Sequence, residues 1–417
     1  MGDSNQPRVA FRGDQIAVVW QSKNSGLTRE DGVTVPRIVA GRVFNFKEAS
    51  LPASVNPTSP TYYASAPDVA REGAGTNNKT ESIGVAIGSN GNVIVGWEDD
   101  GNENTVDYEA VHVVYDSQGN LISKLETMAA VGGATRDSLY HSFYRADGSP
   151  VPPYTGWGPK IKANLFGDGI GMGATAFALG DEVPELLEIQ TDDGGGGDWP
   201  AVQLMNNDGS PIGIRTLADE DAQTQGNIRI GDWEWLSNGN VVVVGESRQG
   251  ADLVNKFGGP RTGNHAAYRV LNAAGAQVKA YDVVSSTKLP NSMWHGAAVT
   301  RNGFAIRFDE GGGRVRLFNN SGVPQGDNIS LAVVAGVATA GGGGRGDGMG
   351  FHGNGNDAYA WVVNAGADLR LSVMDATGKL RWTVNAYEGT EITGGADRPD
   401  CAISADGRVA RSEEHTS

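Results

Sequence analysis

The chain has 417 residues, of which 61 are glycine and 9 are tryptophan, and 39% of the chain is hydrophobic. This apolar fraction is too high for a disordered chain, and the length suits either several domains or one large repeat architecture. The net charge of −16 argues against binding to nucleic acid or anionic lipid, because a strongly acidic surface repels phosphate groups.

A hairpin phrase recurs along the chain. It consists of an apolar strand, a short turn and a second apolar strand that often ends in an aromatic residue. The turns at Asn90-Gly91, Asn238-Gly239 and Asn302-Gly303 predict two-residue hairpins, since type I′ turns need φ > 0 at both central residues. The copies span residues 9–20, 85–97, 235–245, 298–308, 351–361 and 401–410, with a weaker copy at 174–189 around Gly180-Asp181.

A second phrase alternates with the first. It is a single strand followed by a small polar turn that ends in glycine, and a diverged first copy lies at 38–45. Polar residues and glycine at these positions favour tight turns. The other copies span residues 111–119, 139–148, 201–209, 267–275, 314–322 and 369–378.

The alternation gives units of roughly 50 to 65 residues, a period typical of four-stranded propeller blades. A β-helix has a shorter period, and a sandwich does not repeat its sequence so often. We therefore predict an all-β chain, a β-propeller of six to seven four-stranded blades with the last blade truncated. Residues 123–159 do not fit the period, which predicts an inserted loop or hairpin there. The propeller is predicted to form a single domain over residues 1–410.

The last seven residues, Arg411–Ser417, resemble the translation of a common sequencing-adapter oligonucleotide. This resemblance predicts that 411–417 is a non-native tail and that the natural protein continues beyond Ala410. A genuine polar tail is the alternative. The sequence therefore does not fix where the natural protein begins and ends. The lack of an apolar signal segment in residues 1–12 does not exclude export.

The opening unit resembles a repeat of very large bacterial surface proteins and RTX-type exported proteins. The resemblance rests on Ile16–Ser22 with Ala40–Asn45, and on Asn92–Asp99 with Asp116–Gly119. It covers about a quarter of the chain. It implies an extracellular or surface-attached bacterial protein and implies no particular ligand.

Acidic residues follow the second strand of several units. If the units are blades, these residues occupy equivalent places and converge on one face, where carboxylates can bind calcium, an amine or a sugar. A uniformly acidic solvated surface is the alternative interpretation. The predicted ligand-binding residues are Trp97, Glu98, Asp99, Glu246, Asp309 and Glu310.

Calcium is the one cofactor that the sequence suggests, and none is required. Residues 352–360 are close to the RTX calcium nonapeptide, with His352 in place of the first glycine, and this pattern makes Asp357 a candidate ligand. The neighbouring 343–347 segment, which ends in Asp347, is one residue short of a second copy. The alternative for 352–360 is a plain hairpin turn.

Other site types find little support. The single cysteine, Cys401, excludes an internal disulfide, and the six histidines have no pair at zinc-ligand spacing. No nucleophile elbow, P-loop or apolar run long enough to span a membrane is present. Asp375–Trp382 is one residue short of a quinoprotein propeller signature and occurs once.

Two hypotheses about function follow. The first is a non-catalytic extracellular binding or spacer module of a larger bacterial surface protein, with a glycan or a surface protein as its partner. The second is a propeller-fold glycoside hydrolase or lyase that uses the strand-end carboxylates.

The tripeptides at 12–14 and 345–347 read Arg-Gly-Asp, and the first is predicted to lie in a hairpin turn. The sequence carries no signal for an oligomeric state.

Overall fold

The structure is a computed structural model in which the chain forms two compact units. The first unit comprises Met1–Leu179, Gln203–Ile214 and Ser412–Ser417, and the second comprises Gly180–Val202 and Arg215–Arg411. The structure describes residues 4–23, 37–47, 54–57, 62–63, 81–100, 108–115, 121–125, 160–177, 198–207, 228–247, 265–272, 277–285, 295–310, 313–331, 350–365, 368–385 and 400–412.

The elements bounded within these residues run from β1 to β26 and are all strands, which confirms the all-β prediction. Glycine-rich turns and Val, Ile, Phe and Trp in the strands account for this outcome, because β-branched and aromatic side chains suit a pleated, buried surface. Over the described ranges, no helix has the length and apolar character needed to cross a membrane.

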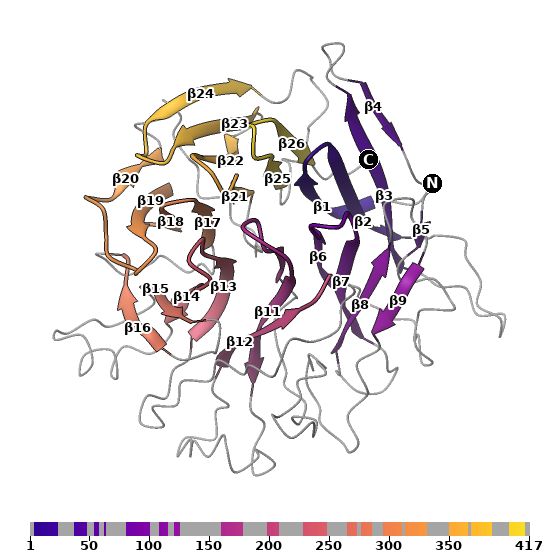
Figure 1. The fold of residues 1–417 in the computed structure, drawn as a ribbon, viewed down its shortest axis with the longest axis horizontal. Helices are drawn as coiled ribbons and strands as arrows, with labels where there is room; N and C mark the ends of the chain where they lie inside the picture. The colour runs from indigo at the N-terminus through magenta and orange to yellow at the C-terminus, as the bar shows by residue number, and fades with distance from the viewer. Residues whose placement is uncertain are drawn as a thin grey trace, which may run out of the picture. The chain divides into compact units, whose positions relative to one another are not determined.

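The first unit holds three sheets made of strands that are consecutive in sequence (Figure 1). Their orders are β1-β2-β3-β4 with β5 beside β3, then β6-β7-β8-β9, then β10-β11-β12. The last strand, β12, begins in residues of the second unit. The bounds are β1 Ser4–Arg12, β2 Gln15–Lys23, β3 Arg37–Lys47, β4 Ser54–Pro57, β5 Tyr62–Tyr63, β6 Glu81–Ile87, β7 Val93–Asp100, β8 Tyr108–Tyr115, β9 Leu121–Leu125, β10 Lys160–Ala163, β11 Ile170–Phe177 and β12 Asp198–Met205.

The second unit holds three four-stranded sheets, β13 to β16, β17 to β20 and β21 to β24, and a two-stranded sheet, β25-β26. The four-stranded sheets confirm the predicted repeat, in which the first phrase supplies strands one and two and the second phrase supplies strand three. The bounds are β13 Ile228–Trp235, β14 Val241–Ser247, β15 His265–Leu271, β16 Gln277–Val283, β17 Gly296–Thr300, β18 Gly303–Asp309, β19 Gly313–Asn319, β20 Ile329–Ser330, β21 Phe351–Gly353, β22 Ala358–Ala365, β23 Asp368–Asp375, β24 Leu380–Asn385, β25 Asp400–Ile403 and β26 Val409–Ser412.

The hydrophobic core lies between neighbouring sheets, so that the inner strands are buried on both faces. In β22, Tyr359 and Trp361 pack with residues of the β17–β20 sheet, whereas Ala360 and Val362 pack with residues of β25. The same division occurs in the first unit around β6 and β7. Burial on both faces explains why these strands are almost continuous apolar runs rather than alternating patterns.

The first strands of successive sheets lie beside one another within each unit. In the first unit β6 contacts both β1 and β10, and in the second unit β13, β17, β21 and β25 follow in that order (Figure 1). This neighbour relation between first strands is typical of propeller blades. The close approach of β21 to β17 depends on Gly353, because a Cβ there would lie 2.6 Å from the carbonyl carbon of Val299.

The predicted two-residue type I′ turns are wrong at Asn90-Gly91 and Asn238-Gly239. Gly88 N donates to the Asn92 carbonyl at 2.7 Å and Gly91 N donates to the Gly88 carbonyl at 3.0 Å, which closes a three-residue loop with Gly91 at φ 84°. Leu236–Asn240 closes in the same way. The physical reason is that the Asn90 side chain accepts the Asn92 N–H at 3.0 Å and so holds the wider loop.

The hairpin at Asn302-Gly303 has a different register. Thr300 pairs with Gly303, so the two-residue loop is Arg301-Asn302 and the glycine belongs to β18. In the region of the weak copy, the first hairpin lies at Asn164–Gly169, between β10 and β11, so that residues 174–177 belong to the second strand. Residues 126–159, the 139–148 copy and Gly180-Asp181 lie outside the described residues.

Candidate functional site

The two edges of each sheet differ in the connections that they carry. At one edge, which we call the turn edge, short loops join strand one to strand two and strand three to strand four. At the other, which we call the open edge, strand two ends, strand three begins and the chain leaves for the next sheet. In the β13–β16 sheet, the turn edge carries 236–240 and the open edge carries 248–264. Sequence between strands two and three is therefore joined to the open edge.

Hydrogen bonds join neighbouring sheets along the turn edge of the second unit. Ser237 Oγ donates to the Arg301 carbonyl, and Asn320 Nδ2 donates to Ser237 Oγ at 2.8 Å and to the Arg301 carbonyl at 3.3 Å. Asn238 Nδ2 also donates to the Asn320 carbonyl at 3.3 Å. The hairpin of the β13–β16 sheet is thereby fixed to both turns of the β17–β20 sheet.

The same contact recurs in the first unit. Asn207 Nδ2 donates to Ser89 Oγ at 2.7 Å, and Asn92 Nδ2 donates to the Asn207 carbonyl at 3.0 Å. Ser89 and Ser237 hold the same place in their Ser-Asn-Gly-Asn loops, and Asn207 and Asn320 hold the same place in their Asn-Asn-x-Gly turns. We call this repeated pair the Ser–Asn turn contact. Its recurrence indicates that these turns serve packing between sheets.

Arg12, the first residue of the first Arg-Gly-Asp tripeptide, also serves packing. Its guanidinium donates to the carbonyl oxygens of Ile87 at 3.3 Å, Asn164 at 3.1 Å and Gly167 at 3.3 Å. The loop between β1 and β2 is Gly13-Asp14, which confirms the predicted place of this tripeptide in a hairpin turn. One side chain thus ties together the first hairpins of three successive sheets.

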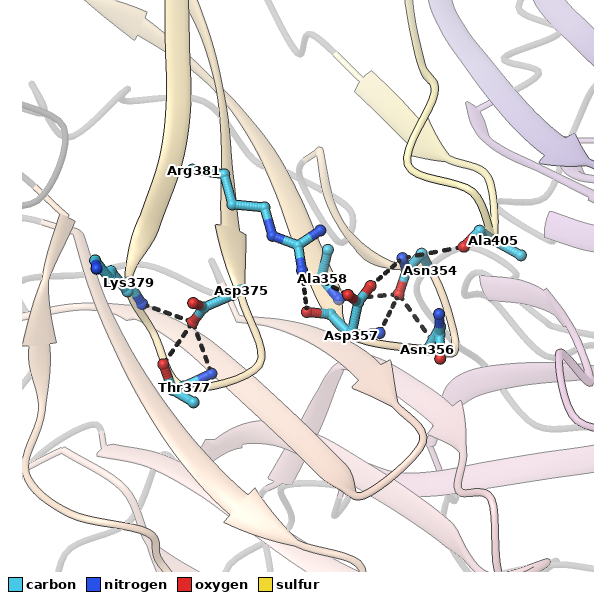
Figure 2. A network of polar contacts seen from close by, with 9 residues as sticks. All are labelled: Asn354, Asn356, Asp357, Ala358, Asp375, Thr377, Lys379, Arg381 and Ala405. Atoms are coloured by element: carbon cyan, nitrogen blue, oxygen red, sulfur yellow. Dashed lines mark hydrogen bonds and ion pairs between the residues drawn. The ribbon is translucent and has the colours of Figure 1, made fainter.

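The calcium candidate of the sequence, Asp357, lies at the turn edge between β21 and β22 (Figure 2). Its Oδ2 lies 2.6 Å from the Arg381 guanidinium and its Oδ1 accepts from Asn354 Nδ2 at 3.1 Å. Asn354 Oδ1 accepts the backbone N–H groups of Asn356, Asp357 and Ala358 at 2.8 to 3.0 Å. The carboxylate therefore already has a cationic partner, and a calcium role for it stays a prediction.

In the second turn of Figure 2, a carboxylate rather than a carboxamide accepts the backbone N–H groups of the loop. Asp375 Oδ1 accepts from the N–H groups of Thr377 and Lys379 at 2.9 and 3.0 Å, and from Thr377 Oγ1 at 2.6 Å. Among the residues that the structure describes, no cluster of three or more His, Cys, Asp or Glu side chains is placed to hold a metal ion. The partner candidate Asp347 lies outside the described ranges.

These turns predict an acid-sensitive second unit. Hydrogen bonds from Arg381 and then Asn354 lower the pKa of Asp357 below its ordinary value of 3.8, and the hydrogen bond from Ser404 lowers the pKa of Asp406. Burial alone would raise the pKa of Asp375, but the bonds from Thr377 and Lys379 lower it. Carboxyls with lowered native pKa values stabilise the fold above pH 3.8, and this stability is lost as pH falls through the native values.

We expect the unfolding free energy of Asp357→Asn to fall less steeply at acidic pH than that of the wild type. The reason is that the variant lacks one of the carboxyls whose native pKa is lowered. Denaturant unfolding between neutral and strongly acidic pH measures this. Asp327→Asn, an exposed acid in the connection between β19 and β20, is the charge-matched control and should leave this pH dependence unchanged. An identical pH dependence in Asp357→Asn and the wild type would show that the Arg381 pair makes no pH-dependent contribution.

The predicted ligand-binding acids lie at the ends of second strands, on the open edge of each sheet. Trp97, Glu98 and Asp99 lie in β7 of the first unit, where the Glu98 backbone pairs with Glu81 and Ala110. In the second unit, Glu246 pairs with Arg229 and Ala266, and Asp309 pairs with Gly313. Glu310 follows β18 directly.

Glu246 and Asp309 belong to adjacent sheets of one unit. The turn ends of these sheets are bonded through Ser237 and Arg301, so the other ends of their strands, which carry the two acids, also lie on a common side. Asp357 lies at the opposite edge. Glu246 and Asp309 therefore lie apart from the calcium candidate of the same unit, and ligand binding by the predicted acids stays a prediction.

Buried aspartates link neighbouring first strands in the second unit. Asp232 in β13 is fully buried, and its Oδ2 accepts the Ala297 N–H of β17 at 3.0 Å. Asp400 in β25 is 6% exposed, and its Oδ1 lies 3.2 Å from His352 Nε2 of β21. Each aspartate stands four positions before the residue that opens its hairpin loop, Leu236 or Ser404.

A buried imidazole lies at the open edge of the β13–β16 sheet. His265 begins β15, and its Nδ1 lies 3.2 Å from Ser285 Oγ, which also accepts the Ala266 N–H at 3.2 Å. His265 is 4% exposed and Ser285 is 2% exposed. The His265 backbone pairs with that of Ser247, so the contact between His265 and Ser285 lies where β14 ends and β15 begins.

Sequence reasoning missed most of these groups. It assigned no role to Asp232, Asp400 or the Ser–Asn turn contact, because each acts across sheets that only the fold brings together. It also assigned none to Ser285, whose contact with His265 lies within one sheet. The signal that could have identified the contact is the repeated Ser-Asn-Gly-Asn loop, which occurs at 89–92 and 237–240. The aspartates could have been identified by aligning the units on their hairpin turns.

Comparison with known proteins gives similarity in fold alone. No family model and no curated protein matches the chain. It is similar to the β-propeller domain of the Trilobed protease from Pyrococcus furiosus, with 7% identity, a TM-score of 0.46 and coverage of 100% of this chain and 96% of that one.

Two further solved structures are similar at the same level. The acylaminoacyl peptidase of Pyrococcus horikoshii has 11% identity and a TM-score of 0.44, covering 99% of this chain and 49% of that one. The chain therefore spans about half the length of that peptidase. The polysaccharide lyase Uly1 has 14% identity and a TM-score of 0.40, covering 91% of this chain and 76% of that one.

Proposed function

We propose that the chain is a non-catalytic, extracellular binding module of the β-propeller type, part of a larger bacterial surface protein. Its four-stranded sheets are the blades, and its partner is a glycan or a surface protein held at the open edge. The observation that carries the proposal is that the two edges of the sheets carry different residues and connections. Side chains of the turn edge such as Ser237 and Asn320 are used in contacts between sheets, whereas the predicted ligand-binding acids and most of the longer connections are joined to the open edge.

The residue types at the open edge suit hydroxyl-rich ligands. Carboxylates such as Glu246 and Asp309 accept hydrogen bonds from sugar hydroxyls, and hydrogen bonds to charged groups are stronger than neutral ones. An aromatic residue such as Trp97 offers a flat apolar surface with a polar N–H. Calcium at these carboxylates is the inorganic alternative, since it prefers oxygen ligands.

A glycan array read with the labelled full chain tests the proposal. We expect binding to at least one glycan, and Glu246→Gln and Asp309→Asn to weaken it about tenfold each, which corresponds to one charge-assisted hydrogen bond. Asp327→Asn, which makes the same chemical change in the sheet of Asp309, should leave affinity unchanged. Equal losses in Asp309→Asn and Asp327→Asn, or no binding by the wild type, would overturn the proposal.

A carbohydrate-active hydrolase or lyase is the second candidate. The observation that favours it is a pair of imidazole contacts, half-buried His352 with Asp400 and buried His265 with Ser285, since such pairs can transfer protons. A polysaccharide incubated with the chain should then give new reducing ends or unsaturated products. Turnover that is lost in Glu98→Gln or Asp309→Asn favours the enzyme, and tight binding without any product favours the binding module.

A further inference from the structure

The chain contains four Asn-Gly steps, at Asn90, Asn238, Asn302 and Asn354. Such a step can react with itself, because the glycine nitrogen has no neighbouring Cβ to block its approach to the asparagine side chain. Attack of this nitrogen on Cγ forms a C–N bond and expels the side-chain nitrogen as ammonia, which leaves a cyclic succinimide. Water then opens the ring to aspartate or isoaspartate. The first step requires a carboxamide that is free to rotate.

Three of the four carboxamides are held by hydrogen bonds. Asn90 Oδ1 accepts the Asn92 N–H at 3.0 Å. Asn238 Oδ1 accepts the Asn240 N–H at 3.1 Å, and its Nδ2 donates to the Asn320 carbonyl at 3.3 Å. Asn354 is buried, and its Oδ1 alone accepts three backbone N–H groups. Each of these bonds must break before Cγ can turn toward the glycine nitrogen.

Asn302 differs from the other three in two respects. It lies in the two-residue loop between β17 and β18, where it is exposed to solvent. No hydrogen bond from any described residue engages its carboxamide, whereas its neighbour Arg301 is fixed through the main-chain carbonyl. The reactive side chain is therefore free on a backbone that is held in place.

We infer that Asn302-Gly303 is a site of spontaneous deamidation in the folded protein. The co-reactant is water, the leaving group is ammonia, and the product carries a carboxylate at position 302 in place of the neutral amide. The isoaspartyl form also inserts a methylene into the backbone of a two-residue loop.

This change acts directly on the Ser–Asn turn contact of the second unit. The Arg301 carbonyl accepts from both Ser237 and Asn320, so lengthening the backbone next to Arg301 displaces the acceptor that joins two sheets. Deamidation at Asn302 should therefore lower the melting temperature of the second unit, whereas deamidation at Asn90 would act only on the first unit.

Peptide mapping by mass spectrometry, after incubation of the full chain at mildly alkaline pH, tests the inference. A single hydrogen bond slows the reaction about fivefold if it contributes its typical net energy to the barrier. We therefore expect Asn302 to react about fivefold faster than Asn90, whose carboxamide makes one hydrogen bond. The ratio of rates should be larger for Asn238, whose carboxamide makes two, and Asn354 should remain intact. Isoaspartate methyltransferase labelling should follow the same order.

The denatured chain is the internal control, since all four steps should react at similar rates once the hydrogen bonds are lost. Asn302→Gln and Asn302→Ser should remove most of the labelling of the folded protein and prevent the fall in melting temperature on ageing. The inference is wrong if Asn90 or Asn238 reacts as fast as Asn302 in the folded chain. It is also wrong if Asn302 shows no product when the denatured control does.

Discussion

Gly353→Ala is expected to destabilise the second unit by about 3 kcal/mol or more. A methyl group at this position would lie 2.6 Å from the carbonyl carbon of Val299 and closer still to its oxygen and nitrogen. All three are backbone atoms of β17, a strand buried on both faces, so none can rotate away as a side-chain terminus could. The contact between β17 and β21 must open instead, and Gly355 N then loses its 3.1 Å bond to the Val299 carbonyl.

Gly239→Ala is the matched control for this variant. Gly239 has φ 81°, and no atom lies within 4 Å of the place that an added methyl group would take, so alanine there costs only the left-handed backbone penalty of about 1 kcal/mol. Denaturant unfolding followed by tryptophan fluorescence measures both variants, since Trp233, Trp235 and Trp361 are buried in the second unit. Equal losses in the two variants would show that first strands do not approach as closely as the fold requires.

Asp232→Ala is expected to cost roughly 3 kcal/mol, because it leaves at least two buried N–H donors without their acceptor. Those donors are Trp233 N, at 2.9 Å from Oδ1, and Ala297 N, at 3.0 Å from Oδ2. The second bond joins β13 to β17, so its loss weakens the contact between two sheets.

Asp232→Asn should cost less, because one carboxamide oxygen remains to accept the Ala297 N–H. Asp327→Ala controls for loss of an exposed acid and should change unfolding free energy by less than about 0.5 kcal/mol. If Asp232→Ala unfolds at the wild-type denaturant concentration, the link between first strands does not support the second unit.

The fold could be predicted from the sequence to the level of four-stranded units because the signals are local. Apolar runs such as Val241–Val244 and turn glycines such as Gly239 lie next to one another in the chain. The loop widths could not be predicted, because they depend on side-chain bonds such as that of Asn90 to Asn92. Asn302-Gly303 shows the same limit, since pairing between β17 and β18 moved the glycine out of the loop.

For the candidate site, the sequence predicted where the acidic residues lie on their strands but not the contacts between sheets. Counting from hairpin turns put Glu246 and Asp309 at equivalent strand ends, and the strand registers place both at the open edge of their sheets. Asp232 and Asp400 share a position relative to their hairpin turns, but the sequence does not show which strand of another sheet each one contacts. Partners separated by 65 and 48 positions, Ala297 and His352, come together only through the packing of first strands.

The most direct test of ligand binding at the open edge is hydrogen exchange of the full chain with and without the glycan that binds most tightly. Binding there predicts slower exchange at the open edge and unchanged exchange at the turn edge. Protection confined to the turn edge, or spread equally over both edges, would contradict it. The open-edge residues to compare are 97–100, 108–110, 246–247, 265–266, 309–310 and 313, and the turn-edge segments are 236–240, 319–323 and 354–358.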